Sequence, residues 1–480
     1  MLGRTAQSTR ASGLVAFAGG RTLTTFPQIN PKTGKVFKEY TEMPEEEINQ
    51  IITDASSAFQ EWRKVSPSNR INIMSALADK LRNRKEEAAE LMQMEMGKPV
   101  AQGIAEVEKC AYLVDWYSKN GHDFLNDTPY PTLPGFSKSY VTYQPLGVIF
   151  AIMPWNFPMW QAVRMGVPTL MAGNAVMLKH APNCFGSALL LEDMMKEIPD
   201  LPQGLFRSII ADIPATTHIM ENDLVQGMAF TGSEVAGRKI ASKAGSLLKK
   251  CVIELGGSDA YAVLKDADLD LAAAAVVNAR MTNGGQVCCA PKRVIVDKSV
   301  KAAFEEKVVE KVAEKKYGKD YGPLVHKKGA EDVAKQVRTS ISEGAKLLIG
   351  GADIDPPTED CGGAFFPPTV LTDVKPGMEC FDHEVFGPVL AIVEAESEEE
   401  AIKLANQSHY GLGAGIFTKD TAHGEAIAKT ELQAGMAFVN DSVRSDPSLP
   451  FGGVKSSGLG RECASFGMLE FVNIKTMCIK

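Results

Sequence analysis

The sequence predicts an α/β fold made of two consecutive domains, each built on a doubly wound, mostly parallel sheet. Short apolar runs alternate with helix-length segments from about residue 146 to residue 256. A second alternation of the same kind follows from about residue 257 to residue 450. Strands that alternate with helices are typical of a parallel sheet covered by helices on both faces. The 480 residues, 45% of them hydrophobic, suffice for two or three domains with cores of their own.

The first 26 residues differ in composition from the rest of the chain. They contain three arginines among serines and threonines, and no acidic residue occurs before Glu39. This composition is typical of a mitochondrial transit peptide, so we expect residues 1–26 to direct the protein to the mitochondrial matrix. A weak secretory signal over residues 13–20, or a plain tail on a cytoplasmic protein, are the alternatives.

An amphipathic helix is predicted directly after Pro44. The stretch "PEEEINQIITDASSAFQEW" opens with this proline and three acidic residues, a common beginning of a helix. Apolar side chains then recur at helical spacing: Ile48, Ile51, Ile52, Ala55, Phe59 and Trp62. Further helices are expected up to about residue 120, where the three prolines of "TPYPTLPGFSK" end the pattern.

Ten short apolar runs are the strand candidates of the two sheets. In the first domain they are "GVIFAIMP", "NAVMLK", "LFRSII", "QGMAFTG" and "CVIEL". In the second domain they are "DAYAVL", "RVIVD", "VLAIVEA", "GAGIFTK" and "GMAFVN". A ligand site to which both domains contribute would lie in the crevice between them.

Charge and cysteine content exclude several classes of protein. The net charge is −8, and the basic residues are dispersed, which argues against a nucleic-acid or anionic-membrane partner. The nine cysteines are an odd number without Cys-x-x-Cys spacing, so we expect neither a disulfide framework nor a metal site. No run approaches 18 apolar residues, so no membrane-spanning segment is predicted.

Two adjacent cysteines, Cys288 and Cys289, follow a Gly-Gly-Gln turn in "GGQVCCAPKR". Free cysteine is commonly a small buried hydrophobe, which is one interpretation of the pair. Glycines allow the backbone to approach a ligand closely, and a thiol becomes nucleophilic where amides or positive charge favour its thiolate. A reactive thiol is therefore the other interpretation.

Two motifs of the first domain are candidates for ligand binding. The stretch "FTGSEVAGRKIA" follows a strand and opens a helix, so the amides around Gly232 could hold a phosphate. An ordinary strand-to-helix turn is the alternative. In "CVIELGG", Glu254 stands at the carboxyl end of a parallel strand, where ligands of such sheets bind. A solvated acid at a strand end is the alternative there.

Six motifs, taken together and in this order, resemble those of the aldehyde dehydrogenase superfamily from about Ile29 to Lys480. They are "PWNFP" (154–158), "FTGSEVAG" (230–237), "ELGG" (254–257), "GQVC" (285–288), "EVFGP" (384–388) and "PFGGVKSSGLGRE" (450–462). The resemblance implies two doubly wound α/β domains plus a small β oligomerisation element, assembled as a homodimer or homotetramer. It also implies the division of the chain into a dinucleotide-binding domain (27–121 and 146–256), a catalytic domain (257–452) and the oligomerisation element (122–145 and 453–480).

The resemblance implies a mechanism with three catalytic residues. Cys288, two residues after the Gln, matches the nucleophile that attacks the aldehyde carbon, and Cys289 is then a packing residue. Asn156 would hydrogen-bond the resulting oxyanion together with the backbone N–H of Cys288. Glu254 is similar to the general base that activates the hydrolytic water.

The resemblance further implies NAD or NADP as cofactor. The residues implied to bind it are Trp155 and Lys179 at the adenosine ribose, Gly232 and Ser233 at the diphosphate, Leu255 at the carboxamide, and Glu384 with Phe386 at the nicotinamide ribose. Pro182 stands where many NAD-preferring members carry a Glu that binds the ribose 2′-hydroxyl. Since no carboxylate there repels a 2′-phosphate, NADP is admitted beside NAD.

Within the superfamily the chain looks most like the succinate-semialdehyde dehydrogenases. Arg164, six residues after "PWNFP", would pair its guanidinium with a substrate carboxylate, and Ser445 resembles a second carboxylate contact. Thr282 replaces an additional Arg of related enzymes, for which Arg280 or Arg444 would compensate.

The sequence leaves several other substrates and functions open. Glutarate semialdehyde or another short aldehyde is an alternative substrate. A cysteine hydrolase or acyltransferase would use the same thiol without a nicotinamide, and a non-catalytic structural member of the fold would use none of these residues.

Overall fold

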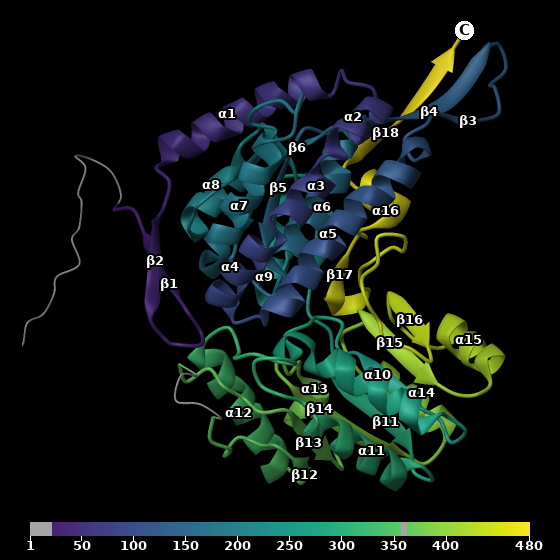
Figure 1. The fold of residues 1–480 in the computed structure, drawn as a ribbon. Helices are drawn as coiled ribbons and strands as arrows, with labels where there is room; N and C mark the ends of the chain where they lie inside the picture. The colour runs from purple at the N-terminus through teal and green to yellow at the C-terminus, as the bar shows by residue number, and fades with distance from the viewer. Residues whose placement is uncertain (1–21, 357–361) are drawn as a thin grey trace, which may run out of the picture.

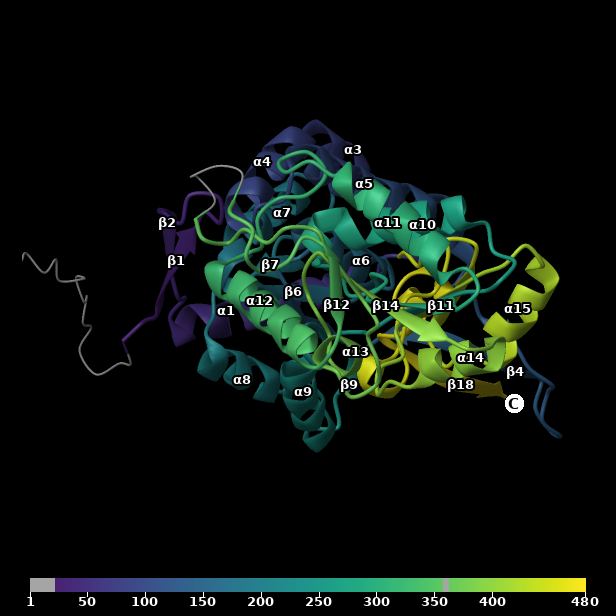
Figure 2. The same ribbon diagram turned by 90° about the horizontal axis from the view of Figure 1, so that it is seen from below.

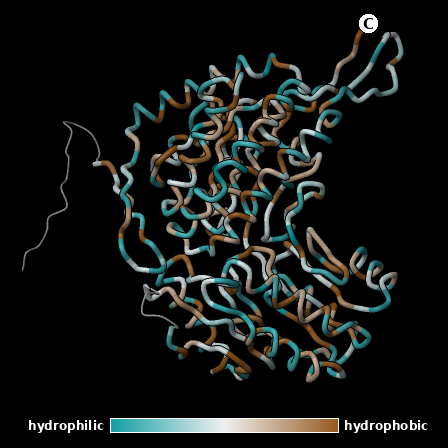
Figure 3. The backbone as a smooth tube through the Cα atoms, in the orientation of Figure 1, coloured by the Kyte–Doolittle hydropathy of each residue, from teal (hydrophilic) through white to brown (hydrophobic). Residues whose placement is uncertain are grey.

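The computed structural model describes residues 22–356 and 362–480, and they form two lobes and a projecting arm (Figure 1). Each lobe contains one sheet, and the arm carries a third, three-stranded sheet. Hydrophobic segments gather inside the lobes, whereas the residues along the outer helix α1 alternate in hydropathy (Figure 3). The predicted class of two α/β units plus a small β element is confirmed.

The first lobe is built on a six-stranded sheet in the order β17-β9-β8-β5-β6-β7. Its strands are β5 (Val148–Met153), β6 (Ala175–His180), β7 (Phe206–Ser208), β8 (Val225–Thr231), β9 (Lys250–Glu254) and β17 (Gly458–Leu459). The first five pair in parallel and coincide with the five predicted runs. β17 pairs antiparallel with β9, so a distant segment completes the sheet.

Helices of the first lobe cover both faces of this sheet, as the continuous burial of its strands requires. They are α1 (Glu45–Trp62), α2 (Pro67–Met74), α3 (Leu77–Asn83), α4 (Lys85–Met96), α5 (Val100–Asn120), α6 (Pro158–Met171), α7 (Phe185–Lys196), α8 (Ile213–Glu221), α9 (Glu234–Ser246) and α16 (Ala464–Leu469). The predicted helix after Pro44 is confirmed as α1, and its apolar face is buried. Trp62 ends this helix and donates its indole N–H to the Leu170 carbonyl (2.7 Å).

The second lobe is built on a seven-stranded sheet in the order β12-β13-β14-β11-β10-β15-β16. The strands are β10 (Ala260–Val263), β11 (Arg293–Asp297), β12 (Lys346–Ile349), β13 (Thr369–Thr372), β14 (Val389–Ala395), β15 (Gly413–Phe417) and β16 (Met436–Val439). Five of them match the predicted runs. The sequence analysis missed β12 and β13, which have four residues each, and β12 is a largely exposed edge strand.

The helices of the second lobe also lie on both sides of their sheet. They are α10 (Leu269–Met281), α11 (Lys301–Ala313), α12 (Lys327–Ser342), α13 (Glu379–Asp382), α14 (Glu398–Asn406) and α15 (Thr421–Thr430). Seen from below, α10 and α11 lie on one side of β11 and β14, and α14 lies on the other (Figure 2). One buried apolar cluster runs from Phe150 and Leu178 of the first lobe to Val294 and Phe304 of the second, so the lobes share a core.

The arm consists of β3 (Thr128–Pro129), β4 (Lys138–Pro145) and β18 (Val472–Ile479) (Figure 1). Eight residues of β18 pair antiparallel with β4, and Ile474 of β18 is 63% exposed. Short helical turns, η1 (Gly121–Asp123), η2 (Pro182–Cys184), η3 (Thr282–Gly285) and η4 (Lys455–Ser457), complete the connections.

A hairpin of β1 (Thr25–Ile29) and β2 (Val36–Thr41) precedes α1. It includes Thr25 and Phe26, the last two residues of the predicted transit peptide. Residues 1–21 of that segment lie outside the described part of the chain.

Candidate active site

A cavity of about 250 Å³ lies between the two lobes and contains the two adjacent thiols. The first lobe contributes side chains of α5 and α6, and the second lobe contributes the loop before β11 and the segment after β16. The side chains that line the cavity include Lys109, Trp160, Gln161, Arg164, Cys288, Cys289, Arg444, Ser445 and Phe451. A volume of this size, below that typical of drug-sized ligands, fits a small substrate.

The loop before the thiols has an unusual backbone that requires glycine. Asn283, Gly284 and Gly285 all have positive φ angles (53°, 62° and 74°). A Cβ atom at Gly285 would collide with the Gly387 carbonyl, so no other residue fits there. Gln286 closes the turn by donating to the Asn283 carbonyl (2.9 Å) and accepting from the Val325 amide (2.9 Å).

The two thiols differ in their surroundings. Cys288 is half-buried, whereas Cys289 is buried, with its Sγ 3.8 Å from the Val443 carbonyl oxygen. A hydrogen bond with Cys289, together with burial, raises the pKa of the Cys288 thiol well above its ordinary value. The positive charges of Arg164 and Lys292 act in the opposite direction on the same pKa. Burial and this hydrogen bond therefore favour the protonated thiol over the thiolate.

Glu254 ends β9 and lies fully buried next to Cys288. Neither carboxylate oxygen has a hydrogen-bond partner among the described residues. Burial, together with the charge of a Cys288 thiolate, raises the pKa of Glu254 well above its ordinary value, while Arg164 lowers it. A carboxyl group in such a setting can exchange a proton with the thiol or with a water molecule beside it.

Asn156 lies in the loop between β5 and α6, and its backbone is held on two sides. Its carbonyl accepts hydrogen bonds from Lys98 Nζ (2.9 Å) and Asn283 Nδ2 (2.8 Å). Its side-chain Nδ2 donates to the Gln286 carbonyl (3.1 Å), and its Oδ1 has no partner among the described residues. The structure thus brings this amide to the loop that carries Cys288.

The sequence analysis missed the buried ion pair that supports Asn156. Lys98 contacts Glu106 Oε2, and the two side chains are 1% and 2% exposed. Glu106 Oε1 accepts from the backbone amides of Met159 and Trp160 (2.9 Å each). These amides lie in the first turn of α6, where backbone N–H groups have no acceptor within the helix. The only signal in the sequence is a charge, Glu106, on the apolar face of a helix.

Arg164 of α6 lines the cavity but is already paired. Its Nη2 lies 2.5 Å from Glu462 Oε2 and donates to Gln161 Oε1 (2.6 Å). The guanidinium also stacks on Phe451, at 4.4 Å from the ring centroid. The expected pairing with a substrate carboxylate therefore competes with an internal carboxylate that the sequence analysis did not anticipate.

Of the other candidates for substrate binding, Ser445 and Arg444 line the cavity and Arg280 does not. Ser445 lines the cavity with a buried hydroxyl that has no nitrogen or oxygen partner among the described residues. Arg444 also lines it, with Nη1 2.6 Å from Asp441 Oδ2. Arg280 does not compensate for Thr282, because it is fully buried outside the cavity. It donates there to the carbonyls of Val389, Gly285 and Val385 (2.5, 3.1 and 2.6 Å).

Glu384, predicted at the nicotinamide ribose, rests on the segment that follows Glu254. Its Oε1 accepts from the Gly257 amide (3.3 Å) and lies 2.9 Å from Lys292 Nζ. A Cβ atom at Gly256 would collide with this carboxylate, so the glycine permits the close approach. The fold thereby joins the motifs "ELGG" and "EVFGP", which are about 130 residues apart in the chain.

Two further predicted cofactor residues, Trp155 and Phe386, lie together, and two more, Lys179 and Pro182, lie at the end of β6 and directly after it. The rings of Trp155 and Phe386 meet edge to face, with centroids 5.7 Å apart. Lys179, near the end of β6, is partly buried, and burial lowers the pKa of its ammonium. Pro182 begins η2, and its carbonyl accepts from Gln28 Nε2 (2.8 Å).

The remaining predicted cofactor residues lie at the carboxyl ends of β8 and β9. Ser233 is exposed and caps α9, since its Oγ accepts from the Ala236 amide (3.4 Å). The Gly232 amide donates to the Glu254 carbonyl (3.1 Å), so it is occupied within the sheet. Leu255 is buried, and its amide donates to Ser457 (2.9 Å). The amino terminus of α9, directly after Gly232 and Ser233, is the kind of place where a diphosphate binds.

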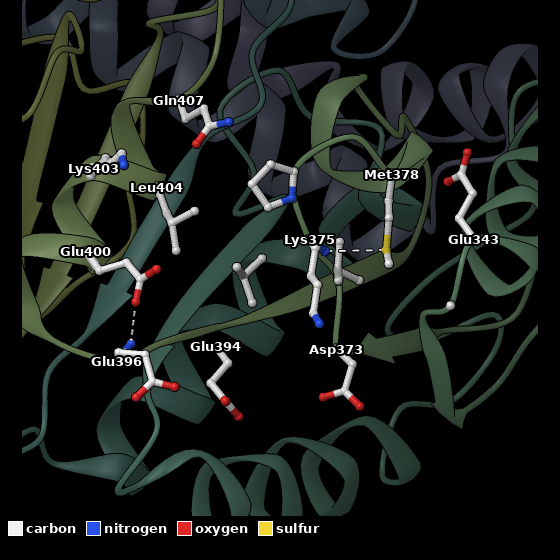
Figure 4. A pocket seen from close by; sticks show the side chains of 14 residues that line it. Glu343, Asp373, Lys375, Met378, Glu394, Glu396, Glu400, Lys403, Leu404 and Gln407 are labelled. Carbon is white, nitrogen blue, oxygen red and sulfur yellow. Dashed lines mark hydrogen bonds between the residues drawn. The ribbon is translucent and has the colours of Figure 1, made fainter.

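A wider cavity of about 780 Å³ lies elsewhere, at the carboxyl ends of β13 and β14 (Figure 4). Most of the charged side chains that line it are acidic, and Asp373 and Glu394 lie on either side of Lys375. Lys301 and Lys346 hold Asp373 at 2.6 and 2.9 Å, which lowers the pKa of Asp373 to about 2. None of the predicted site residues lines this cavity.

Residues 22–356 and 362–480 contain no cluster of three or more His, Cys, Asp or Glu side chains suited to a metal ion. Within the same residues no helix combines the length and the apolar character that crossing a bilayer requires.

Known proteins resemble this chain over most of its length. Succinate semialdehyde dehydrogenase [NAD(P)+] Sad of Escherichia coli is 41% identical over 457 residues, which cover 94% of this chain and 96% of that protein. A probable succinate-semialdehyde dehydrogenase [NADP(+)] of Synechocystis is 40% identical and is covered to 99%.

The predicted location in the mitochondrial matrix is wrong. The relatives at 40 to 41% identity come from Escherichia coli, mycobacteria and Synechocystis, which are bacteria and have no mitochondria. An arginine-rich, acid-poor composition is a weak signal on its own, because any short basic segment can show it.

Solved structures share the fold over 94 to 95% of the chain. Succinic semialdehyde dehydrogenase from Streptococcus pyogenes, in complex with NADP+, is 34% identical, with a TM-score of 0.89 over 94% of this chain and 99% of that chain. Betaine aldehyde dehydrogenase from Staphylococcus aureus, in complex with NAD+, is 28% identical, with a TM-score of 0.89 over 95% of this chain and 91% of that chain. Residues 17–477 match the Aldehyde dehydrogenase family, and the chain belongs to this family.

Proposed function

We propose that the protein oxidises succinate semialdehyde to succinate with NAD or NADP. One observation carries the proposal: Cys288 lines the small cavity between the lobes, the Glu254 carboxyl lies next to its thiol, and the Asn156 amide is bonded to the loop that carries it. The relatives named succinate-semialdehyde dehydrogenases at 40 to 41% identity support the choice of substrate.

Cys288 is the proposed nucleophile, because both cysteines line the cavity but only Cys288 is half-buried, whereas Cys289 is buried. Transfer of the thiol proton to a water molecule in the cavity would leave a thiolate, which forms a bond to the aldehyde carbon. Arg164 and Lys292 favour that thiolate electrostatically.

The oxyanion formed in this attack needs hydrogen-bond donors. Asn156 Nδ2 uses one hydrogen for the Gln286 carbonyl and has a second available, and the backbone N–H of Cys288 is the other proposed donor. Lys98 and Asn283 hold the Asn156 backbone, so the amide is positioned before the substrate arrives.

The residues between the lobes fit a nicotinamide dinucleotide, since the Glu384 carboxylate is held over Gly256 and Gly257 beside the nucleophile loop. A bound NAD or NADP would supply the hydride acceptor. The proposed contacts are Trp155, Lys179, Pro182, Gly232, Ser233, Leu255, Glu384 and Phe386. Glu254 then takes a proton from the water that releases the carboxylate product from Cys288.

Arg164 and Ser445, which the sequence motifs suggested, remain proposed contacts of the substrate carboxylate. Both line the cavity. The Ser445 hydroxyl has no nitrogen or oxygen partner among the described residues, which supports its part. The ion pair of Arg164 with Glu462 leaves less of the guanidinium free to bind a substrate carboxylate.

The domain functions are part of the same proposal. Residues 27–121 and 146–256 would bind the dinucleotide, and residues 257–452 would carry the catalytic thiol. Residues 122–145 and 453–480 would assemble a homodimer or homotetramer through the arm. Several exposed apolar side chains of these segments support a subunit contact: Tyr130, Leu133, Phe136, Ile474 and Ile479.

The test is a set of initial rates with succinate semialdehyde, glutarate semialdehyde, propanal and benzaldehyde, each with NAD and with NADP. The proposal expects the highest kcat/KM for succinate semialdehyde. Equal rates with propanal, or turnover without cofactor reduction, would contradict it.

A further inference from the structure

Three cationic side chains line the cavity beside Cys288, and they differ in what neutralises them. Arg164 pairs with Glu462 at 2.5 Å, and Arg444 pairs with Asp441 at 2.6 Å. The third is Lys109, for which no ion pair exists among residues 22–356 and 362–480. A partly buried ammonium without a carboxylate is a ready partner for an anionic ligand.

Lys109 is held in place by the helices around it. It lies on α5, and its Nζ stands 4.2 Å from the centroid of the Trp160 ring. Glu106, one helical turn earlier, accepts from the Trp160 amide (2.9 Å) and so keeps α6 against α5. The ammonium is therefore positioned over the ring without a partner of opposite charge.

The acidic residue next to Lys109 in sequence does not neutralise it. Glu108 points to the other side of α5, where it lies 2.6 Å from Lys85 and 3.5 Å from Arg82. Burial lowers the pKa of Lys109, and the nearby positive charge of Arg164 lowers it as well. A carboxylate that entered the cavity would be the missing counter-ion.

We propose that Lys109 binds the carboxylate of the substrate and selects short aldehydes that carry one. The substrate would span the cavity, with its aldehyde at Cys288 of the second lobe and its carboxylate at Lys109 of the first. The cavity of about 250 Å³ limits the chain to a short one. This inference rests on the proposed function, and it assigns to Lys109 the charge that Arg164 shares with Glu462.

The experiment compares succinate semialdehyde with butanal, which has the same number of carbons and no charge, in Lys109→Met and in Lys109→Gln. Each variant should raise KM for succinate semialdehyde and so lower kcat/KM by about tenfold or more. Tenfold corresponds to the lower end of the free energy that a hydrogen bond to a charged group contributes. The value for butanal should stay unchanged. Lys109→Arg should retain the preference, and Lys119→Met, an exposed lysine of the same helix, is the matched control.

A second readout does not depend on turnover. Succinate should slow the alkylation of Cys288 by iodoacetamide in the wild type and no longer do so in Lys109→Met. In the kinetic comparison, succinate semialdehyde and butanal are measured with the same variant preparation. Partial misfolding would therefore lower kcat/KM for both substrates alike and leave their ratio unchanged.

Retention of the wild-type preference in both Lys109 variants, or an equal loss for both substrates, would overturn the role of Lys109 and leave the proposed function standing. A wild type that does not prefer succinate semialdehyde over butanal would overturn both.

Discussion

Lys292 Nζ lies 2.9 Å from Glu384 Oε1 and 3.0 Å from the Val287 carbonyl, and it also contacts the Cys288 carbonyl. One ammonium, 2% exposed, thus joins the carboxylate proposed for the nicotinamide ribose to the backbone of the nucleophile loop. Cofactor binding and the position of the thiol are therefore connected through a single side chain.

Lys292→Met should weaken the binding of NAD and NADP, because Glu384 would lose the cation that orients it. A loss of about tenfold or more in affinity is expected for a hydrogen bond between charged groups, measured by isothermal titration calorimetry. The control is Lys298→Met, which removes the same charge from an exposed pair with Glu396. Unchanged affinity in Lys292→Met would show that Glu384 does not need this partner.

Cys288→Ala should abolish turnover, whereas Cys289→Ala should retain most of it, because of the two cysteines that line the cavity only Cys288 is half-buried. Steady-state rates of both purified variants, with circular dichroism as the check of folding, decide this. A similar loss in two folded variants would refute the assignment of the nucleophile.

Cys289→Ala should also make Cys288 more reactive at lower pH. The hydrogen bond with Cys289 is the largest cause that raises the pKa of Cys288, so its removal should lower that pKa. The rate of iodoacetamide alkylation against pH should therefore move toward acid in Cys289→Ala. A profile identical to that of the wild type would mean that burial alone governs the thiol.

Glu254→Gln should stall the release of product while hydride transfer continues. The expected result is a burst of reduced cofactor about equal to the enzyme concentration, followed by slow turnover, in stopped-flow absorbance. The amide preserves shape and removes the base. A trace without a burst would place Glu254 before hydride transfer, as the base that activates Cys288.

His180 should make the fold sensitive to acid. Burial lowers its pKa from 6.5 to about 4, its Nε2 lies 3.0 Å from the Pro158 carbonyl, and its Nδ1 accepts from Ala181 (2.9 Å). Since the unfolded chain takes up this proton more readily, the stabilisation is present above pH 6.5 and is lost as pH falls toward about 4. The contribution of the neutral His180 to the free energy of unfolding amounts to roughly 3 kcal/mol.

The measurement is urea unfolding of the wild type and His180→Gln between pH 4 and pH 7. The difference in unfolding free energy between them should grow with pH over this window. Glu95 and Asp259, whose pKa values burial raises to about 7, titrate in the opposite sense in both proteins and cancel in the difference. A difference that does not vary with pH would contradict the role given to His180.

The elements that the sequence predicted are those whose pattern is local. The helix after Pro44 and ten strands were found because apolar residues recur with the period of each element over consecutive residues. β12, β13 and β17 were missed because they have two to four residues and exist through pairing with distant strands.

By itself, the sequence determined the α/β class, most of the strands, and the candidates Cys288, Glu254 and Asn156, because residue types at short spacings carry that information. Only the tertiary structure decided which charges are free. Arg164 is neutralised by Glu462, almost 300 residues later, whereas Lys109 has no such partner in the part of the chain that the structure describes. The physical reason is that ion pairing and burial depend on distance in space, and distance along the chain does not predict either.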